Sequence, residues 1–556
     1  MTYAGRSSRR TATTTLSSCP DSTFSIFERV ARADQAGWCL GILAIMTGWL
    51  LSLERPGSQR AVIGACLVLH AVFWALVHNA LQLDDAIHHD MSEAWAWGQE
   101  WQLGYSKHPP LFAWVTAAWF SLVPRGDGTF YLLTTSVGAV AMAGVWALIG
   151  RLAGRREQVL AVLLLSLTPA VTIQLAKFNA NTALLLTWPW TMYFLVRMLQ
   201  DRRIVDGAML GLFAGLAMLT KYYSVVLLGT CAVALLLHPD CRRLLRSAAP
   251  YVAALVFCTV LAPHVVWLLH SGAPTVDYAL AKISGSAWST RLHAFGVLAT
   301  TLAVMAAAAA FIAIVFGRHG VEMLARNIAA TGNRATLWLA AIVWGPLAFT
   351  LLAAWVFNVG ISNEFLIPGF VALPGMFVVA ARRPVTDVQV RRALGSICLL
   401  WIGAALAASF VSYVAVAKPT PGTHRAVPLV ATQMTDDWRA RFGVRLRFVG
   451  GIEDLAMAIA FYSADAPSYV NLQQRDATPW ADHDRLQQGG VLVACLAADT
   501  ACALRAAALG AVASARVRIS GVRLRDAGAK TVRDVHIFMR PPGAQPTNGR
   551  AHRLAR

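Results

Sequence analysis

The chain has 556 residues, of which 57% are hydrophobic and only 14% are charged, and its mean hydropathy is +0.53. This composition excludes an ordinary water-soluble protein, in which about 25% of residues are charged, and indicates a protein that crosses a membrane many times. The net charge of +19 would also suit a nucleic-acid-binding protein. However, the arginine clusters lie in short loops between apolar runs, as the positive-inside rule expects, so we predict no nucleic-acid partner.

The N-terminal residues 1–36 are rich in Arg, Ser and Thr, which predicts a disordered basic tail and not a cleaved signal peptide. Residues 37–417 form the predicted membrane domain, an all-α bundle of about 11–12 transmembrane helices. Its apolar runs, each long enough to cross or nearly cross the hydrocarbon core, are 37–53, 61–78, 131–149, 159–175, 182–199, 208–220, 222–237, 251–269, 294–316, 335–357, 364–381 and 395–416. The topology of 37–53 is left open, because a span there would place a basic tail outside.

Arginine clusters occupy every second loop from Arg151 to Arg392, which predicts that these loops face the cytoplasm. The opposite face then carries 79–130, 176–181, 270–293, 358–363 and everything after about 418. A full crossing by 111–123 would break this alternation, so we predict that this run is a helix at the outer interface. The expected location is a bacterial inner membrane, with the active site facing the periplasm.

Beyond the last apolar run, residues 418–540 predict a small α/β domain outside the membrane. Short apolar runs of strand length occur at Arg445–Gly450, Ser468–Leu472, Val491–Leu496 and Val535–Met539, with a helix at Glu453–Tyr462. Cys495 and Cys502 lie in this domain, where an oxidising compartment could join them. Residues 541–556 read as a disordered tail.

The first outer loop, 79–130, holds the residues best suited to chemistry. Asp90 and Glu93 are three residues apart, so they would share one face of a short helix, and one of them could act as a general base. Lys107 and His108 precede a stiff Pro-Pro step, which would hold both at the level of the lipid headgroups, where a phosphate could be bound. A solvated acidic loop without catalytic function is the simpler alternative.

The run Asp90-x-x-Glu93-Ala94-Trp95, followed by Gly104-Tyr105-x-Lys107-His108-Pro109-Pro110-Leu111, resembles the signature of bacterial family-39-type glycosyltransferases of the GT-C class. These enzymes are related to protein O-mannosyltransferases and to the aminoarabinose transferase of lipid A. Two later segments, Phe178–Thr182 and Leu219–Tyr222, also resemble landmarks of that family. The resemblance covers residues of about 60 to 470 in order, and so is more specific than a single motif.

The resemblance implies a role for each matching residue. Asp90 would be the catalytic carboxylate that deprotonates or orients the acceptor, with Glu93 in support, and Lys107 and His108 would hold the polyprenyl phosphate or a divalent cation. Two departures leave these roles open. Many relatives have adjacent Asp and Glu, so either carboxylate could be the functional one, and many carry an aspartate in the second outer loop where this chain has Asn181, beside Asn179.

Two further lysines and one histidine pair are candidate ligands. Lys177 lies at a span end and could bind phosphate, or its side chain could simply extend towards the interface. Lys221 interrupts an apolar stretch, where a charge needs a partner or a ligand, unless the residue forms an outer turn. A divalent metal is the one cofactor for which ligands are present, with His89 and Asp90 as candidates beside His88.

Together these features predict a membrane glycosyltransferase that inverts the sugar while moving it from a polyprenyl-phosphate carrier. The acceptor would be an envelope glycolipid, a polysaccharide or a protein, with membrane lipid around the donor. The alternative is a polytopic transporter or flippase of a lipid-linked or small polar substrate. A transporter places its ionisable residues near the membrane midplane, whereas this chain concentrates its acidic residues in an outer loop.

Overall fold

The computed structural model describes residues 59–82, 86–281, 292–299, 302–303, 306, 309–317, 322, 334–358, 360–381, 383–417, 426–519 and 533–543. The predicted tail 1–36, the run 37–53 and most of the tail 541–556 lie outside these residues, as does part of 294–316. Residues 65–556 form one compact unit. Its membrane part is helical, and a five-stranded sheet forms in the C-terminal part, so the predicted fold class is confirmed.

Four helices in the described part of the chain are long and apolar enough to span a membrane. They are α3 (Gln59–Leu81), α6 (Asp127–Ile149), α13 (Ala249–His270) and α19 (Asp387–Ala417). A fifth candidate is bent by 76° between α7 (Arg155–Leu165) and the short 3-10 helices η1 (Pro169–Val171) and η2 (Ile173–Ala176). Pro169 accounts for this break, because its ring removes a backbone donor.

Other predicted spans are divided into shorter helices. The run at 182–199 forms α8 (Ala180–Ala183), η3 (Leu184–Leu186) and α9 (Trp188–Asp201). The stretch 208–237 forms α10 (Ile204–Thr220), η4 (Tyr222–Ser224) and α11 (Val225–Leu237), and 364–381 forms α17 (Asn363–Phe370) and α18 (Leu373–Ala380). The run 335–357 forms α16 (Arg334–Phe357). Non-helical backbone within a membrane protein is tolerated where it is buried or lines a cavity, so these breaks point to a site.

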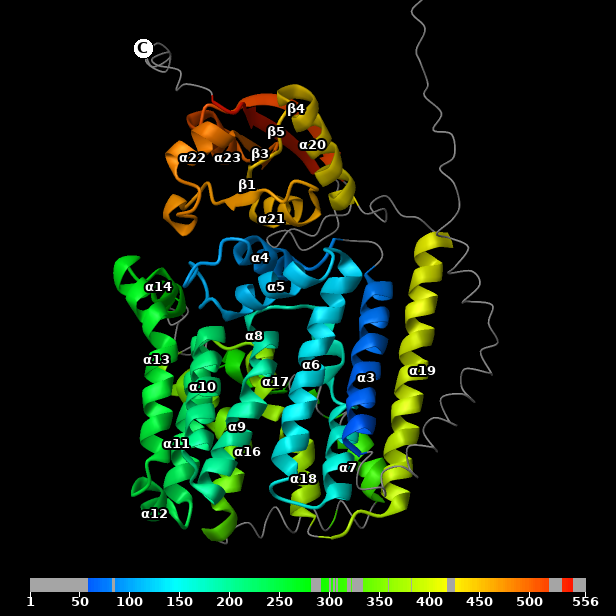
Figure 1. The fold of residues 1–556 in the computed structure, drawn as a ribbon. Coiled ribbons are helices and arrows are strands. Elements are labelled where there is room, and N and C mark those ends of the chain that lie inside the picture. The colour runs from blue at the N-terminus through cyan, green and yellow to red at the C-terminus, as the bar shows by residue number, and fades with distance from the viewer. Residues whose placement is uncertain are drawn as a thin grey trace, which may run out of the picture. The chain divides into compact units, whose positions relative to one another are not determined.

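The first outer loop contains two short helices, α4 (His89–Gly98) and α5 (Leu111–Leu122). They lie between the membrane helices and the C-terminal domain, and α12 (Cys241–Leu245) lies at the opposite end of the bundle (Figure 1). At 12 residues, α5 is only about 18 Å long and cannot cross a bilayer. It occupies the place expected for an interface helix.

The C-terminal domain begins with α20 (Ala426–Phe442) and contains a mixed sheet in the order β2-β1-β3-β5-β4. Strands β1 (Phe448–Gly451), β2 (Ser468–Val470) and β3 (Val491–Leu496) are parallel, whereas β5 (Arg533–Arg540) pairs antiparallel with β3 and with β4 (Val512–Ile519). Helices α21 (Glu453–Tyr462), α22 (His483–Gly489) and α23 (Thr500–Ala508) connect the strands. Cys495 and Cys502 form a disulfide between β3 and α23.

Helix α21 attaches the C-terminal domain to the first outer loop. The Tyr462 hydroxyl accepts a hydrogen bond from the Ile87 backbone (2.8 Å), and the Trp95 indole donates to the Ala460 carbonyl (3.3 Å). Phe461 packs edge-on against Trp95 and is almost fully buried. Apolar burial combined with hydrogen bonds of this kind holds the loop in one conformation, and the loop carries the candidate site.

Candidate active site

Asp90 lies in the first turn of α4, as the sequence predicts. One carboxylate oxygen is 3.0 Å from His89 Nε2, and the other accepts a 2.8 Å hydrogen bond from Asn179 Nδ2. Burial opposes ionisation, but the hydrogen bond from His89 and the charges of the His88 and His89 rings outweigh it, so the pKa of Asp90 lies well below its ordinary value. The carboxylate is therefore ionised at neutral pH.

The second outer loop meets Asp90 through two asparagines. Asn179 caps α8, because its side-chain oxygen accepts from the backbone N–H groups of Asn181 and Thr182 at 2.9 and 3.0 Å. This cap directs the Asn179 amide N–H₂ towards Asp90 and towards Glu364 Oε2 (3.3 Å). The Asn181 amide donates to the same Glu364 oxygen at 2.9 Å.

Glu364, at the start of α17, joins the separate loops into one network. Lys177 donates to Glu364 Oε1, and its ammonium nitrogen is 3.9 Å from Asp90. Lys221 donates to the side-chain oxygen of Asn181 and lies 3.7 Å from the centre of the Phe365 ring. The backbone of Lys221 is extended and interrupts the helix between α10 and η4, and this places the Lys221 side chain beside Asn181. Four segments distant in sequence thus contribute side chains to one site.

Glu93 belongs to a second, adjoining cluster. Lys107 Nζ lies 2.6 Å from Glu93 Oε2 and 2.6 Å from Glu453 Oε1 of the C-terminal domain. Burial raises the pKa of Glu93, and the charge of Lys107 offsets this only in part. Burial also opposes the charge on Lys107, but Glu93 and Glu453 outweigh it and raise the pKa of its ammonium group. Lys107 therefore stays charged and links the first outer loop to α21.

An apolar cavity of about 230 Å³ lies beside these clusters, and we name it the basic cavity. Lys107, His108 and Lys221 contribute to its wall, so three of the predicted phosphate ligands meet there. The remaining lining residues are Pro109, Tyr222, Tyr223, Val225, Val226, Thr275, Tyr278, Ala279, Thr350, Ala353, Gly360, Ile361 and Phe365. A cavity with apolar walls and cationic side chains suits an amphiphile with an anionic head.

The predicted metal ligands form a compact group. Donor atoms of His88, His89 and Asp90 all lie within 4.8 Å of one another. His88 Nδ1 accepts a hydrogen bond from the Asp90 backbone at 3.2 Å, which fixes the orientation of this ring within the group. Two imidazoles and a carboxylate fit a divalent transition metal, so the residues are compatible with one.

Two acidic residues of the site, Glu364 and Glu453, were not predicted from the sequence. The signal for Glu364 is a carboxylate at the start of an apolar run, where an uncompensated charge is unfavourable and therefore indicates a partner. Glu453 gives no such signal, because an acidic residue in the first turn of a soluble helix is ordinary. The predicted residues themselves, Asp90, Lys177, Asn179, Asn181 and Lys221, lie in one network.

Residues 107–267 match the family described as dolichyl-phosphate-mannose-protein mannosyltransferase. Two relatives come from Rhizobium johnstonii. The lipid A galacturonosyltransferase RgtD is 27% identical over 218 residues, which is 39% of this chain and 45% of RgtD. The lipopolysaccharide core galacturonosyltransferase RgtA is 24% identical over 330 residues, 57% of this chain and 63% of RgtA. The chain therefore spans about half to three fifths of these curated relatives.

Among solved structures, ArnT from Cupriavidus metallidurans bound to undecaprenyl phosphate has a similar fold. The TM-score is 0.57 at 15% identity, and the match covers 86% of this chain and 98% of ArnT. The apo form of ArnT gives a TM-score of 0.56 at 14% identity, covering 88% of this chain and 98% of ArnT. The predicted resemblance to GT-C glycosyltransferases is thus confirmed in fold and in partial sequence similarity.

Proposed function

We propose that this chain is a multi-pass inner-membrane glycosyltransferase that transfers a sugar from a polyprenyl-phosphate carrier to an acceptor on the periplasmic face. The similarity to two galacturonosyltransferases and the ArnT-like fold support a glycosyl transfer. The two relatives are named for lipid A and for the lipopolysaccharide core, so an envelope glycolipid is the first acceptor to test. A polysaccharide or a protein is the next.

The observation that carries the proposal is the basic cavity, which a chain of hydrogen bonds links to Asp90. The polyprenyl chain would occupy its apolar part, and the phosphate would lie against Lys221, His108 and Lys107. Asn181 connects this cavity to the Asp90 network, because it accepts from Lys221 and donates to Glu364. In this proposal the donor phosphate and the candidate base lie at opposite ends of one chain of hydrogen bonds.

The reaction is a single displacement at the anomeric carbon. The acceptor hydroxyl oxygen forms a bond to that carbon, and the bond from the carbon to the phosphate oxygen breaks, with its electron pair leaving on the phosphate. The hydroxyl proton moves to the Asp90 carboxylate. Because the hydroxyl attacks from the side opposite the leaving phosphate, the configuration of the sugar is inverted. Lysines fixed around the leaving phosphate stabilise the developing charge without reorganisation. Glu93 is the second candidate for the base, and it is already paired with Lys107.

A divalent ion would be held by His88, His89 and Asp90, and it would supply Lewis-acid stabilisation of an oxygen during transfer. Glu364 would then orient Asn179 and Lys177 around the carboxylate that binds the ion. Loss of activity on chelation and its return with one added metal would support this part of the proposal. Full activity after exhaustive chelation would contradict it.

The test incubates the purified protein with radiolabelled polyprenyl-phosphate sugars and extracted envelope lipids and follows the label. We expect transfer to a glycolipid, and Lys221→Met should raise the donor concentration for half-maximal rate by at least about tenfold. Lys221→Arg keeps the charge and serves as the matched control. Absence of transfer from every lipid-phosphate donor would favour the transporter alternative.

A further inference from the structure

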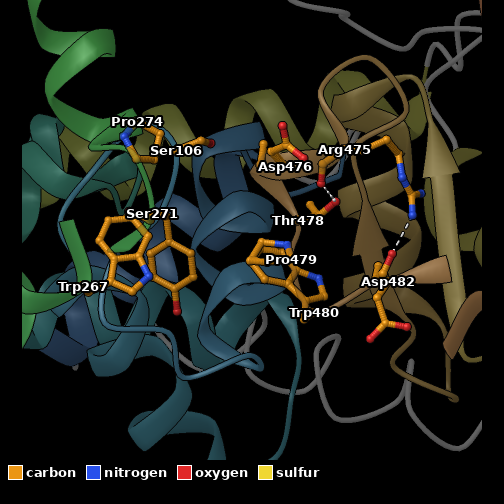
Figure 2. A pocket seen from close by; sticks show the side chains of 14 residues that line it. Ser106, Trp267, Ser271, Pro274, Arg475, Asp476, Thr478, Pro479, Trp480 and Asp482 are labelled. Atoms are coloured by element: carbon orange, nitrogen blue, oxygen red, sulfur yellow. Dashed lines mark hydrogen bonds between the residues drawn. The ribbon is translucent and has the colours of Figure 1, made fainter. Parts of the chain in front are cut away.

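A second cavity, of about 340 Å³, lies where the first outer loop, the outer end of α13 and the C-terminal domain meet, and we name it the aromatic cavity. Figure 2 shows Trp267, Ser271 and Pro274 on one side and the segment Arg475–Asp482 on the other. Gly104, Tyr105 and Ser106 of the outer loop complete the wall. The aromatic cavity has no part in the mechanism described above.

The rings of Tyr105, Trp267 and Trp480 lie in this wall, and neighbouring side chains hold each of them in place. Tyr105 stacks on Trp97 (centroids 4.9 Å apart) and meets Trp480 edge-on at 6.3 Å. Trp480 donates its indole N–H to the Tyr469 carbonyl at 2.9 Å. Trp267 stacks on His264, and it packs so closely on Gly104 that a Cβ there would lie 2.3 Å from its ring. Flat aromatic surfaces held in place are the usual platform for the C–H face of a sugar ring.

The polar side chains of the aromatic cavity include the hydroxyl groups of Ser106, Ser271 and Thr478, two carboxylates and one guanidinium. The charged groups of this cavity therefore sum to a negative charge, whereas the lysines of the basic cavity are positive. One guanidinium nitrogen of Arg475 already donates to the Ala481 carbonyl at 2.6 Å. Two carboxylates beside one guanidinium leave an excess of negative charge, which disfavours a phosphate, whereas carboxylates, hydroxyl groups and the unpartnered Nη1 of Arg475 can accept from or donate to sugar hydroxyls.

The two cavities share a wall. Tyr105 and Ser106 line the aromatic cavity, and the next residue, Lys107, lines the basic cavity. At the start of α14 (Pro274–Ala281), Pro274 lines the aromatic cavity and Thr275 lines the basic one. Thr275 donates a 2.6 Å hydrogen bond to the Tyr105 carbonyl, so the two cavities adjoin at this contact.

The aromatic cavity also adjoins the lipid-facing side of α13. Leu255 and Leu269 on this helix are 67% and 79% exposed, as expected for side chains in contact with acyl chains. Ser271 follows directly after the helix and lines the cavity. A lipid lying along α13 would therefore place its headgroup at the cavity.

We infer that the aromatic cavity binds the saccharide headgroup of a glycolipid acceptor whose acyl chains lie along α13. The inference rests on the proposed transferase function and names the acceptor class. Trp267 offers its partly exposed ring to the sugar, with the buried rings of Tyr105 and Trp480 packed behind it, and Asp476 and Asp482 accept from the sugar hydroxyls. Donor and acceptor then occupy adjoining sites, so one enzyme holds both reactants without competition for a site.

The test measures binding of radiolabelled core oligosaccharide, freed from its lipid by mild acid, to the full-length protein in nanodiscs. Trp267→Ala should weaken binding at least about tenfold, because it removes the most accessible aromatic face. Asp476→Asn should weaken it by about threefold or more, and this exposed position leaves the fold intact. The matched controls are Trp101→Ala, 55% exposed in the first outer loop, and Asp484→Asn, exposed in α22.

Polyprenyl phosphate binding should stay unchanged in all four variants, and in transfer assays only the acceptor KM should rise. Oligosaccharide binding that is equal in variants and controls would overturn the inference, as would displacement of the oligosaccharide by polyprenyl phosphate. Binding that depends on Trp267 without any sugar transfer would support the cavity assignment and overturn the transferase instead. Normal transfer with an unchanged acceptor KM in Trp267→Ala would overturn the cavity assignment alone.

Discussion

Replacing Asp90 by Asn is the sharpest test of the proposed mechanism. The substitution keeps the size of the side chain and removes its charge. The remaining oxygen can accept from His89 or from Asn179, but the new N–H₂ group then faces the other donor. Lys177, 3.9 Å away, loses one of its two carboxylate neighbours and keeps Glu364.

The size of the effect follows from two separate terms. A general base contributes about 10²–10⁴-fold to the rate, equivalent to about 3–5 kcal/mol in the barrier. The attraction between Asp90 and Lys177 at 3.9 Å is at most about 4 kcal/mol at an effective dielectric of 20, and partial exposure of both side chains reduces it further. The loss of charge therefore should not unfold the site, while the rate should fall by at least about two orders of magnitude.

The assay is single-turnover transfer with saturating donor, together with the amount of protein in the membrane. Asp277→Asn, an exposed aspartate of α14 (Pro274–Ala281), is the matched control and should transfer normally. Glu93→Gln is measured in parallel. Normal turnover in Asp90→Asn with an inactive Glu93→Gln would assign the base to Glu93. Normal turnover in both would refute a catalytic role for the first outer loop.

Three further predictions concern the rest of the network and the C-terminal domain. Glu364→Gln should lower kcat at least about tenfold, because Lys177 and Asn179 lose the carboxylate that orients them. The amount of protein in the membrane should change little. Glu322→Gln is the control, and equal transfer rates in the two variants would contradict the network. Asp465→Ala leaves the buried Leu446 N–H without its 2.7 Å partner, so thermal unfolding should report a loss of about 1–3 kcal/mol. Burial opposes the charge of Asp465, but its hydrogen bonds outweigh this and lower the pKa of the carboxyl group. The loss of unfolding free energy in the variant should therefore be complete above about pH 4 and shrink as the pH falls further. A loss that stays constant down to about pH 2 would contradict this prediction. The double substitution Cys495→Ser and Cys502→Ser removes the disulfide that closes a short loop, and should lower the free energy of unfolding by about 2–3 kcal/mol. Equal melting temperatures of wild type and variant would contradict this prediction.

Some of the C-terminal domain could be predicted from sequence to the residue. The helix at Glu453–Tyr462 and the strand at Val491–Leu496 have the predicted bounds, because the helix joins two acidic first-turn residues to an alanine-rich apolar run and the strand is a continuous apolar run. Strand Val512–Ile519 was missed. It alternates small and basic residues and lies at the edge of the sheet, with Val512 70% exposed, so it lacks a continuous hydrophobic pattern.

In the membrane part, the sequence predicts apolar runs but not their interruptions. Lys221 was the exception, because a charge inside an apolar stretch indicates a break or a partner, and the structure shows both. The break before Trp188 has no comparable signal, because a run of leucines is compatible with a continuous helix. Such breaks are stabilised by neighbouring helices, and this information is tertiary.

The asparagines of the second outer loop show how the structure resolves a doubt that the sequence raised. The family resemblance implies an aspartate in this loop, whereas this chain has Asn181, which leaves the loop without a carboxylate. In the structure Glu364 lies within hydrogen-bond distance of Asn179 and Asn181, and so supplies a carboxylate to this loop from another helix. The loop and α17 together therefore provide one acid and two amide donors, and the acid carries the pairing with Lys177.

The cluster around Lys107 differs from this network in its net charge. One ammonium group faces two carboxylates, Glu93 and Glu453, at 2.6 Å each, so the cluster carries one net negative charge when both acids are ionised. A phosphate approaching Lys107 would meet this excess charge. Burial raises the pKa of Glu93, and a proton on that carboxyl group would bring the cluster to neutrality. Donor binding in the basic cavity and protonation of Glu93 should therefore favour each other, which gives Glu93 a part in donor binding distinct from the role of base proposed for Asp90.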